Sequence, residues 1–190
     1  MLKKITYSFL FFLGLQLVLF SCCKEKTLLV NLQSLEIYDN EEATLPIASE
    51  DFMMYLNLIY NYEDITFVPN TSINFNTALA TTCPDDVYVY GSVFTNINIT
   101  ADTVINGVAA GESLNSIMKF AYYDIEDLLE ISEFYDPSDN NTHYNQKAPD
   151  TIILVFNEDL ASQTEFKLSV TVETSNSNTF SVTSNTYLIE

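Results

Sequence analysis

The chain lacks several residues on which protein chemistry often depends. Its 190 residues contain only four glycines and a single histidine, His143, and tryptophan is absent. Serine- and cysteine-based catalysis uses a histidine to take the proton of the nucleophile. His143 lies beside Tyr144 in a polar, asparagine-rich segment, which is typical of an exposed loop and not of a catalytic base. We therefore expect no nucleophilic enzyme of this kind.

The same shortages restrict metal and phosphate sites. Transition metals are bound by clusters of histidine and cysteine, and one histidine with three cysteines gives little material for such a cluster. Phosphate-binding loops need closely spaced glycines followed by lysine and serine or threonine. Gly107 and Gly111 have no such sequence after them. We expect no cofactor.

Basic residues are also scarce. The chain has 26 acidic residues against seven basic ones, all of them lysine, and a net charge of −19. Such a field repels the phosphate backbone of nucleic acids, so we expect no nucleic-acid partner. Cations and basic protein surfaces would be attracted. The simplest interpretation is that the acidic residues keep an exported protein soluble.

The N-terminus has the features of a secretory signal peptide. Two lysines precede a mainly apolar run, Ile5 to Phe20, which is shorter than the about 20 residues of a membrane-spanning helix. Its end, Leu19-Phe20-Ser21-Cys22, resembles the lipobox of bacterial lipoproteins. We therefore expect residues 1–21 to be removed, Cys22 to carry lipid, and residues 22–27 to form a short tether. The alternative is a buried N-terminal helix followed by an incidental pair of cysteines.

Two further cysteines remain after lipidation of the first. An exported chain meets an oxidising compartment in many bacteria, where leftover thiols tend to pair. This favours a disulfide between Cys23 and Cys83 that fixes the tethered end to the domain. The alternatives are two free thiols or an acylation of Cys23.

Acidic segments leave calcium as the metal ion that best suits this chain, because its ligands are oxygens. The best local candidate combines Asp136, Asp139 and Asn141. It is not an EF-hand, because the sixth position counted from Asp139 is Tyr144 and not glycine. A solvated loop whose side chains cap turns is the simpler interpretation. A hydrolase that uses paired carboxylates is a further alternative, but so many acidic residues make that pattern unspecific.

Most of the remaining chain alternates apolar and polar residues as strands do. Apolar spacings of three and four residues predict one or two short helices within residues 112–134. We therefore expect one domain over residues 28–190, an immunoglobulin-like antiparallel β-sandwich with a short helical insertion. The predicted strands lie within Leu28–Ile37, Phe52–Tyr62, Tyr88–Ile99, Thr151–Phe156 and Phe166–Ile189, with a hairpin loop at Ser175–Asn178.

Several short motifs occur in order along the chain. The lipobox precedes a second cysteine, the triplet Glu50-Asp51-Phe52, a segment from Ala78 to Cys83, an Ile97-x-Ile99 strand and the loop Ala110–Asn115. In this combination the chain resembles a Bacteroidota family of small cell-envelope lipoproteins known only as a domain of unknown function. The resemblance implies an envelope lipoprotein with a β-rich domain and a disulfide near the N-terminus. It implies no activity and no catalytic residues.

These observations favour a non-enzymatic lipoprotein of the cell envelope that binds or supports another molecule. We expect it to reach the outer membrane through its lipid and to have an envelope protein or a glycan as its partner. The acidic run that accompanies surface export is missing after Cys22, which favours a periplasm-facing domain. An alternative is a surface module that captures carbohydrate or peptide on Tyr122, Tyr123, Tyr135 and Tyr144. The simpler interpretation is that these tyrosines pack the helical insertion onto the sandwich.

Overall fold

β-Strands dominate the computed structural model, which describes residues 26–38, 46–66, 85–122, 125–135, 143–144 and 150–190. The larger sheet contains, in spatial order, β6 (Leu129–Glu130), β5 (Met118–Ala121), β8 (Thr151–Phe156), β2 (Met54–Asp64), β1 (Thr27–Tyr38), β3 (Val87–Tyr90) and β7 (His143–Tyr144). The smaller sheet contains β11 (Thr179–Thr183), β10 (Leu168–Thr174) and β4 (Phe94–Ala101). A short pair is formed by β12 (Tyr187–Leu188) and β9 (Glu165–Phe166).

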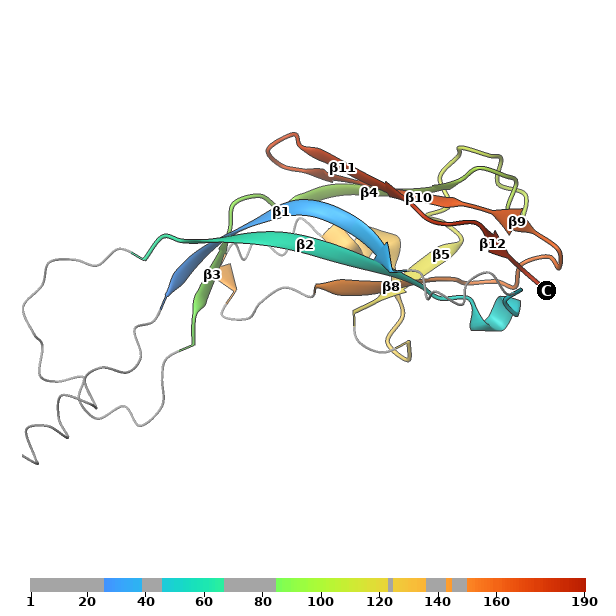
Figure 1. The fold of residues 1–190 in the computed structure, drawn as a ribbon, viewed down its shortest axis with the longest axis horizontal. Helices are drawn as coiled ribbons and strands as arrows, with labels where there is room; N and C mark the ends of the chain where they lie inside the picture. The colour runs from blue at the N-terminus through green and yellow to red at the C-terminus, as the bar shows by residue number, and fades with distance from the viewer. Residues whose placement is uncertain (1–25, 39–45, 67–84, 123–124, 136–142, 145–149) are drawn as a thin grey trace, which may run out of the picture.

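The two sheets are stacked as two layers, with β4, β10 and β11 above β1, β2 and β8 in Figure 1. This arrangement confirms the predicted β-sandwich. Neighbouring strands run antiparallel except for β1 and β3, which pair in parallel from Thr27 opposite Val87 to Val30 opposite Tyr90. The immunoglobulin-like topology remains a prediction.

The core lies between the two sheets and follows the alternation of the strands. Alternate residues of β4 and β10 are fully buried, as are those of β2 and β8. At the end that holds the short strand pair, four aromatic rings pack together with centroids 5.1–6.0 Å apart. Rings at these separations add to the stability that burial of their area provides. These four are Phe52, Phe156, Phe166 and Tyr187.

The hairpin of β1 and β2 is the longest pairing in the larger sheet. Its register shifts between Leu32 and Ser34, which leaves Gln33 as a bulge. The bulge restores the pattern, because Leu35 then faces the core as Leu32 does. If all of β1 paired with β2 without a bulge, the second half of β1 would turn its apolar side chains to solvent.

The predicted strand over Tyr88–Ile99 is in fact two strands in different sheets. The break occurs at Gly91, whose N–H donates a hydrogen bond of 2.9 Å to the carbonyl of Val30 on β1. A Cβ at this position would overlap the side-chain carboxamide of Asn31, so glycine permits the close approach. After Gly91 the chain leaves β3 in the larger sheet and enters β4 in the smaller one.

The helical insertion predicted for residues 112–134 is wrong for most of its length. Met118–Ala121 form β5, and Ile131–Tyr135 form the 3-10 helix η3. The helical spacing arose because Leu114 is buried in a turn just before a buried strand, and turn and strand together mimic a three- and four-residue period.

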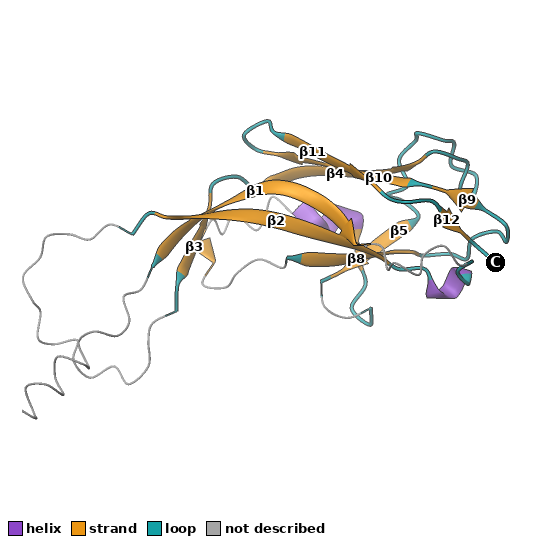
Figure 2. Ribbon diagram, in the orientation of Figure 1, coloured by secondary structure: helices purple, strands orange, loops and turns teal. Residues whose placement is uncertain are grey.

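The helix η3 supplies packing between the layers (Figure 2). Phe134 on η3 stacks on Phe94 of β4 at 5.0 Å and contacts Phe120 of β5 edge-to-face at 5.5 Å, so it joins the two sheets. The second helix, η1 (Ser49–Asp51), is a single turn that precedes β2.

Candidate functional site

Two tyrosines lie side by side on the outer face of the larger sheet. Tyr38 on β1 is opposite Tyr55 on β2, and Tyr55 is opposite Ile153 on β8. Residues in register across neighbouring strands share a face, with Cβ atoms about 5 Å apart. The side chains of Tyr38 and Tyr55 are 62% and 36% exposed. We call Tyr38, Tyr55 and Ile153 the tyrosine row.

A polar row crosses the same face one step along the strands. It consists of Glu36, Asn57 and Thr151, which occupy β1, β2 and β8 in register. The hydroxyl of Thr151 donates a hydrogen bond of 2.7 Å to Oδ1 of Asn57. The Nδ2 group of Asn57 takes no part in this bond. Two residues along a strand correspond to about 7 Å, so the polar row borders the tyrosine row.

Hydroxyl and carboxamide side chains cover the outer face of the smaller sheet. Thr183, Ser169 and Thr100 form one row across β11, β10 and β4, and Ser181, Thr171 and Asn98 form the next. The hydroxyls pair across the strands, at 2.8 Å for Ser169 with Thr183 and 3.0 Å for Thr171 with Ser181. These two rows carry no charge in a chain of net charge −19.

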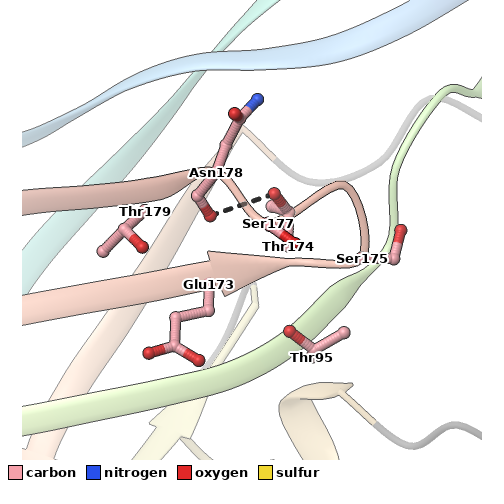
Figure 3. A pocket seen from close by; sticks show the side chains of 7 residues that line it. All are labelled: Thr95, Glu173, Thr174, Ser175, Ser177, Asn178 and Thr179. Atoms are coloured by element: carbon pink, nitrogen blue, oxygen red, sulfur yellow. Dashed lines mark hydrogen bonds between the residues drawn. The ribbon is translucent and has the colours of Figure 1, made fainter.

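A polar hollow of about 370 Å³ lies at the end of this face, where β10 turns into β11 (Figure 3). Thr174 holds the turn, because its hydroxyl donates to Oδ1 of Asn176 at 2.6 Å and its N–H donates to the carbonyl of Asn178 at 3.0 Å. Glu173 supplies a single carboxylate, and no histidine, cysteine or lysine lines the hollow. The hollow therefore offers hydrogen bonds but no pair of groups for acid–base chemistry. The lining residues are Thr95, Glu173, Thr174, Ser175, Ser177, Asn178 and Thr179.

Other tyrosines lie on the inner face of the larger sheet and contact one another. Tyr60 and Tyr62 have ring centroids 6.4 Å apart, and Tyr62 contacts Tyr88 edge-to-face at 6.3 Å. Burial raises the pKa of the Tyr60 phenol well above its usual value, and the nearby phenols of Tyr90 and Tyr62 raise it further. Tyr60 is therefore a protonated, neutral residue that packs among the other tyrosines.

Of the four tyrosines in the aromatic patch predicted from the sequence, Tyr122 is the one whose side chain the structure describes. Tyr122 is half-buried and contacts Phe120 edge-to-face at 5.1 Å, so it packs onto the core. Tyr144 lies in β7, where its backbone pairs with that of Tyr88, and Tyr135 ends η3. Tyr123 lies outside the described residues.

The other predicted sites fall on parts of the chain that the structure leaves undescribed. These are the signal peptide and most of the tether, the cysteines Cys22, Cys23 and Cys83, and the calcium candidates Asp136, Asp139 and Asn141. His143 is described by its backbone, which pairs with Val89 in β7. Within the described ranges, no three histidine, cysteine, aspartate or glutamate side chains gather as a metal site would require.

The alternation of apolar and polar residues in β1 and β2 already indicates the face on which Tyr38 and Tyr55 lie. With Ile37, Leu56 and Leu58 facing inward, Tyr38 and Tyr55 must face outward. The sequence does not show that the two outward tyrosines are neighbours, because their register depends on the bulge at Gln33. The predicted patch instead used tyrosines near the expected helical insertion.

Comparison with known proteins gives no family for this chain. No family model, curated protein or solved structure matches it. The resemblance to small Bacteroidota lipoproteins therefore stays a prediction. Over the ranges that the structure describes, none of the helices has the length and apolar character needed to cross a membrane.

Proposed function

We propose that this protein is a non-enzymatic lipoprotein of the bacterial cell envelope whose β-sandwich binds another molecule. The observation that supports this proposal best is the tyrosine row. The inner face of the larger sheet packs against the core, whereas Tyr38 and Tyr55 lie on its outer face with the polar row beside them. Aromatic side chains that are both exposed and adjacent are enriched at binding surfaces.

The position of β1 relative to the lipid supports the same proposal. β1 begins at Thr27, five residues after Cys22, so an extended tether spans at most about 17 Å. The end of the sheet at Thr27 then lies near the membrane. β1 has 12 residues and Tyr38 is its last, so the tyrosine row lies roughly 36 Å along the strand from Thr27. A ligand can reach it there without contacting lipid.

Metabolic labelling of the full chain with an alkyne-bearing fatty acid tests the anchor. Cys22→Ser should abolish labelling, whereas the matched control Cys23→Ser should leave it unchanged. Labelling that persists in Cys22→Ser would contradict the lipid anchor.

Proteinase K treatment of intact cells tests the orientation. We propose a periplasm-facing domain, so the protein should be degraded after the outer membrane is opened and not before. Degradation in intact cells would place the domain on the cell surface. A domain on the cell surface would instead favour binding of a ligand from outside the cell.

A second candidate function is that of a structural subunit that contacts a protein through the edge of the smaller sheet. The N–H of Ser184 donates to the carbonyl of Leu168, and the N–H of Thr174 donates to the carbonyl of Asn178. Because this pattern alternates along β11, the backbone groups of Thr179, Ser181 and Thr183 point away from β10. No other described residue bonds these outward groups. An exposed edge of this kind can accept a strand from a partner.

A proline substitution on β11 tests whether a partner binds this edge. Ser181→Pro removes an outward N–H without breaking the β10–β11 ladder, and proline is tolerated on edge strands. Crosslinking in cells should lose a stoichiometric partner in Ser181→Pro and keep it in the control Ser181→Ala. Equal crosslinking in both variants would exclude this edge as the contact.

A further inference from the structure

We propose that the tyrosine row and the polar row together form a binding site for a neutral saccharide. This inference rests on the proposed binding function and names the class of its ligand. The side chains proposed to contact the sugar lie on three adjacent strands. They are Tyr38 and Tyr55 of the tyrosine row, with Glu36, Asn57 and Thr151. None of them belongs to the aromatic patch predicted from the sequence.

The two tyrosines form a platform for a sugar ring. One face of a pyranose carries mainly C–H groups, which are apolar and slightly positive, and the π face of an aromatic ring is negative. The Cβ atoms of Tyr38 and Tyr55 are about 5 Å apart, so their rings span about the length of one sugar unit or slightly more. Neither ring packs against another described aromatic side chain, in contrast to Tyr60 and Tyr62.

The polar row supplies hydrogen bonds for the hydroxyls of that sugar. Asn57 accepts from Thr151 through Oδ1, and no described residue accepts from its Nδ2, so both Nδ2 donors remain for a ligand. Glu36 is exposed opposite Asn57 and offers acceptor oxygens. Sugar hydroxyls are both donors and acceptors, so a carboxamide beside a carboxylate can bond adjacent hydroxyls.

Charge decides between neutral and anionic sugars. The site contains Glu36 and no cation. Lys119 on β5 is opposite Val155, two positions along β8 from Ile153, and forms an ion pair with Glu130 at 3.2 Å. The net charge of −19 adds a negative field over the whole surface. Uronic and sialic acids would be repelled, which leaves uncharged oligosaccharides as the ligand class.

Calorimetric titration of the full lipidated chain in detergent tests the site. The probes are cellohexaose, laminarihexaose, xylohexaose and mannohexaose, with an oligomer of galacturonic acid as the anionic comparison. The variants are Tyr38→Ala, Tyr55→Ala and Asn57→Ala, with Tyr38→Phe to keep the ring. Tyr62→Ala is the matched control, because Tyr62 is 37% exposed and its ring contacts Tyr60 and Tyr88 on the inner face. Thermal unfolding identifies any variant that fails to fold. If Tyr55→Ala fails to fold, Tyr38→Ala still tests the site, because Tyr38 is 62% exposed.

We expect at least one neutral hexasaccharide to bind and the galacturonic acid oligomer not to bind. Tyr38→Ala and Tyr55→Ala should each weaken binding about tenfold, whereas Tyr38→Phe and Tyr62→Ala should change it by less than about threefold. Three results would overturn the proposal. They are no binding of any neutral probe, equal binding of the anionic oligomer, and equal weakening by Tyr62→Ala. A chain labelled at Cys22 that binds no saccharide would overturn this site and leave the lipid anchor intact.

Discussion

The side chain of Asn115 bonds the backbone at Ile99 as a neighbouring strand would. Oδ1 of Asn115 accepts a hydrogen bond of 3.0 Å from the N–H of Ile99, and Nδ2 donates one of 2.7 Å to the carbonyl of Ile97. The N–H of Leu114 adds a bond of 2.7 Å to the carbonyl of Ile99. These bonds cover the edge of β4 that β10 leaves free, so one side of the smaller sheet is closed to further strands.

Replacing Asn115 with alanine should therefore destabilise the protein. The backbone groups of Ile97 and Ile99 lie next to fully buried side chains and would lose their partners, which costs about 1–3 kcal/mol. Urea unfolding of Asn115→Ala measures the change. Asn98→Ala, on the outer face of the same strand, should stay within about 0.5 kcal/mol of the natural protein. Equal losses in the two variants would contradict the role of the carboxamide.

A side chain at Gly91 should displace the side chain of Asn31. Gly91→Ala puts a Cβ against Oδ1 of Asn31, the far end of a flexible side chain next to an exposed glycine, so we expect a cost of about 1 kcal/mol or less. In a double-mutant cycle measured by urea unfolding, Asn31→Ala should recover most of that loss. Additive effects of the two substitutions would show that the cost lies elsewhere, for example in the contact with Leu29.

Truncation within the aromatic cluster should be among the most damaging changes to the core. Phe166 is 1% exposed and contacts the rings of Phe52, Phe156 and Tyr187. Phe166→Ala should lower the free energy of unfolding by about 3–5 kcal/mol, because it removes a large buried ring and leaves a cavity. Leu188→Ala serves as the control, since Leu188 is 38% exposed on the neighbouring strand and should cost about 1 kcal/mol or less.

Alkaline pH should destabilise the protein through Tyr60. Burial raises the pKa of this phenol in the folded state, whereas in the unfolded chain it ionises near its ordinary pKa of about 10. The stability from keeping Tyr60 protonated is complete below about pH 10 and is lost as the pH rises above that value. Between about pH 9 and 11.5, the natural protein should lose more stability than Tyr60→Phe, measured by urea unfolding at each pH. Parallel pH profiles would show that Tyr60 is solvated.

The alternation of apolar residues was sufficient to predict most of the fold. Leu28–Ile37, Phe52–Tyr62 and Thr151–Phe156 each overlap a strand of the larger sheet, and the hairpin at Ser175–Asn178 joins β10 and β11. Period-two patterns report which face of a strand is buried, and in this chain that was enough to predict a two-layer β fold. The shortages of histidine, glycine and arginine likewise come from composition alone and limit the chemistry that any fold could offer.

Tertiary structure decided the features that depend on which strands become neighbours. Met118–Ala121 became a strand because it pairs with β8 in the larger sheet and Phe134 of η3 packs on its Phe120, although its spacing predicted a helix. Tyr38 and Tyr55 became a surface pair because the bulge at Gln33 sets the register of β1 on β2. Local periodicity determines the face on which a side chain lies, but only long-range pairing determines the side chain beside it, because that neighbour comes from a distant part of the chain.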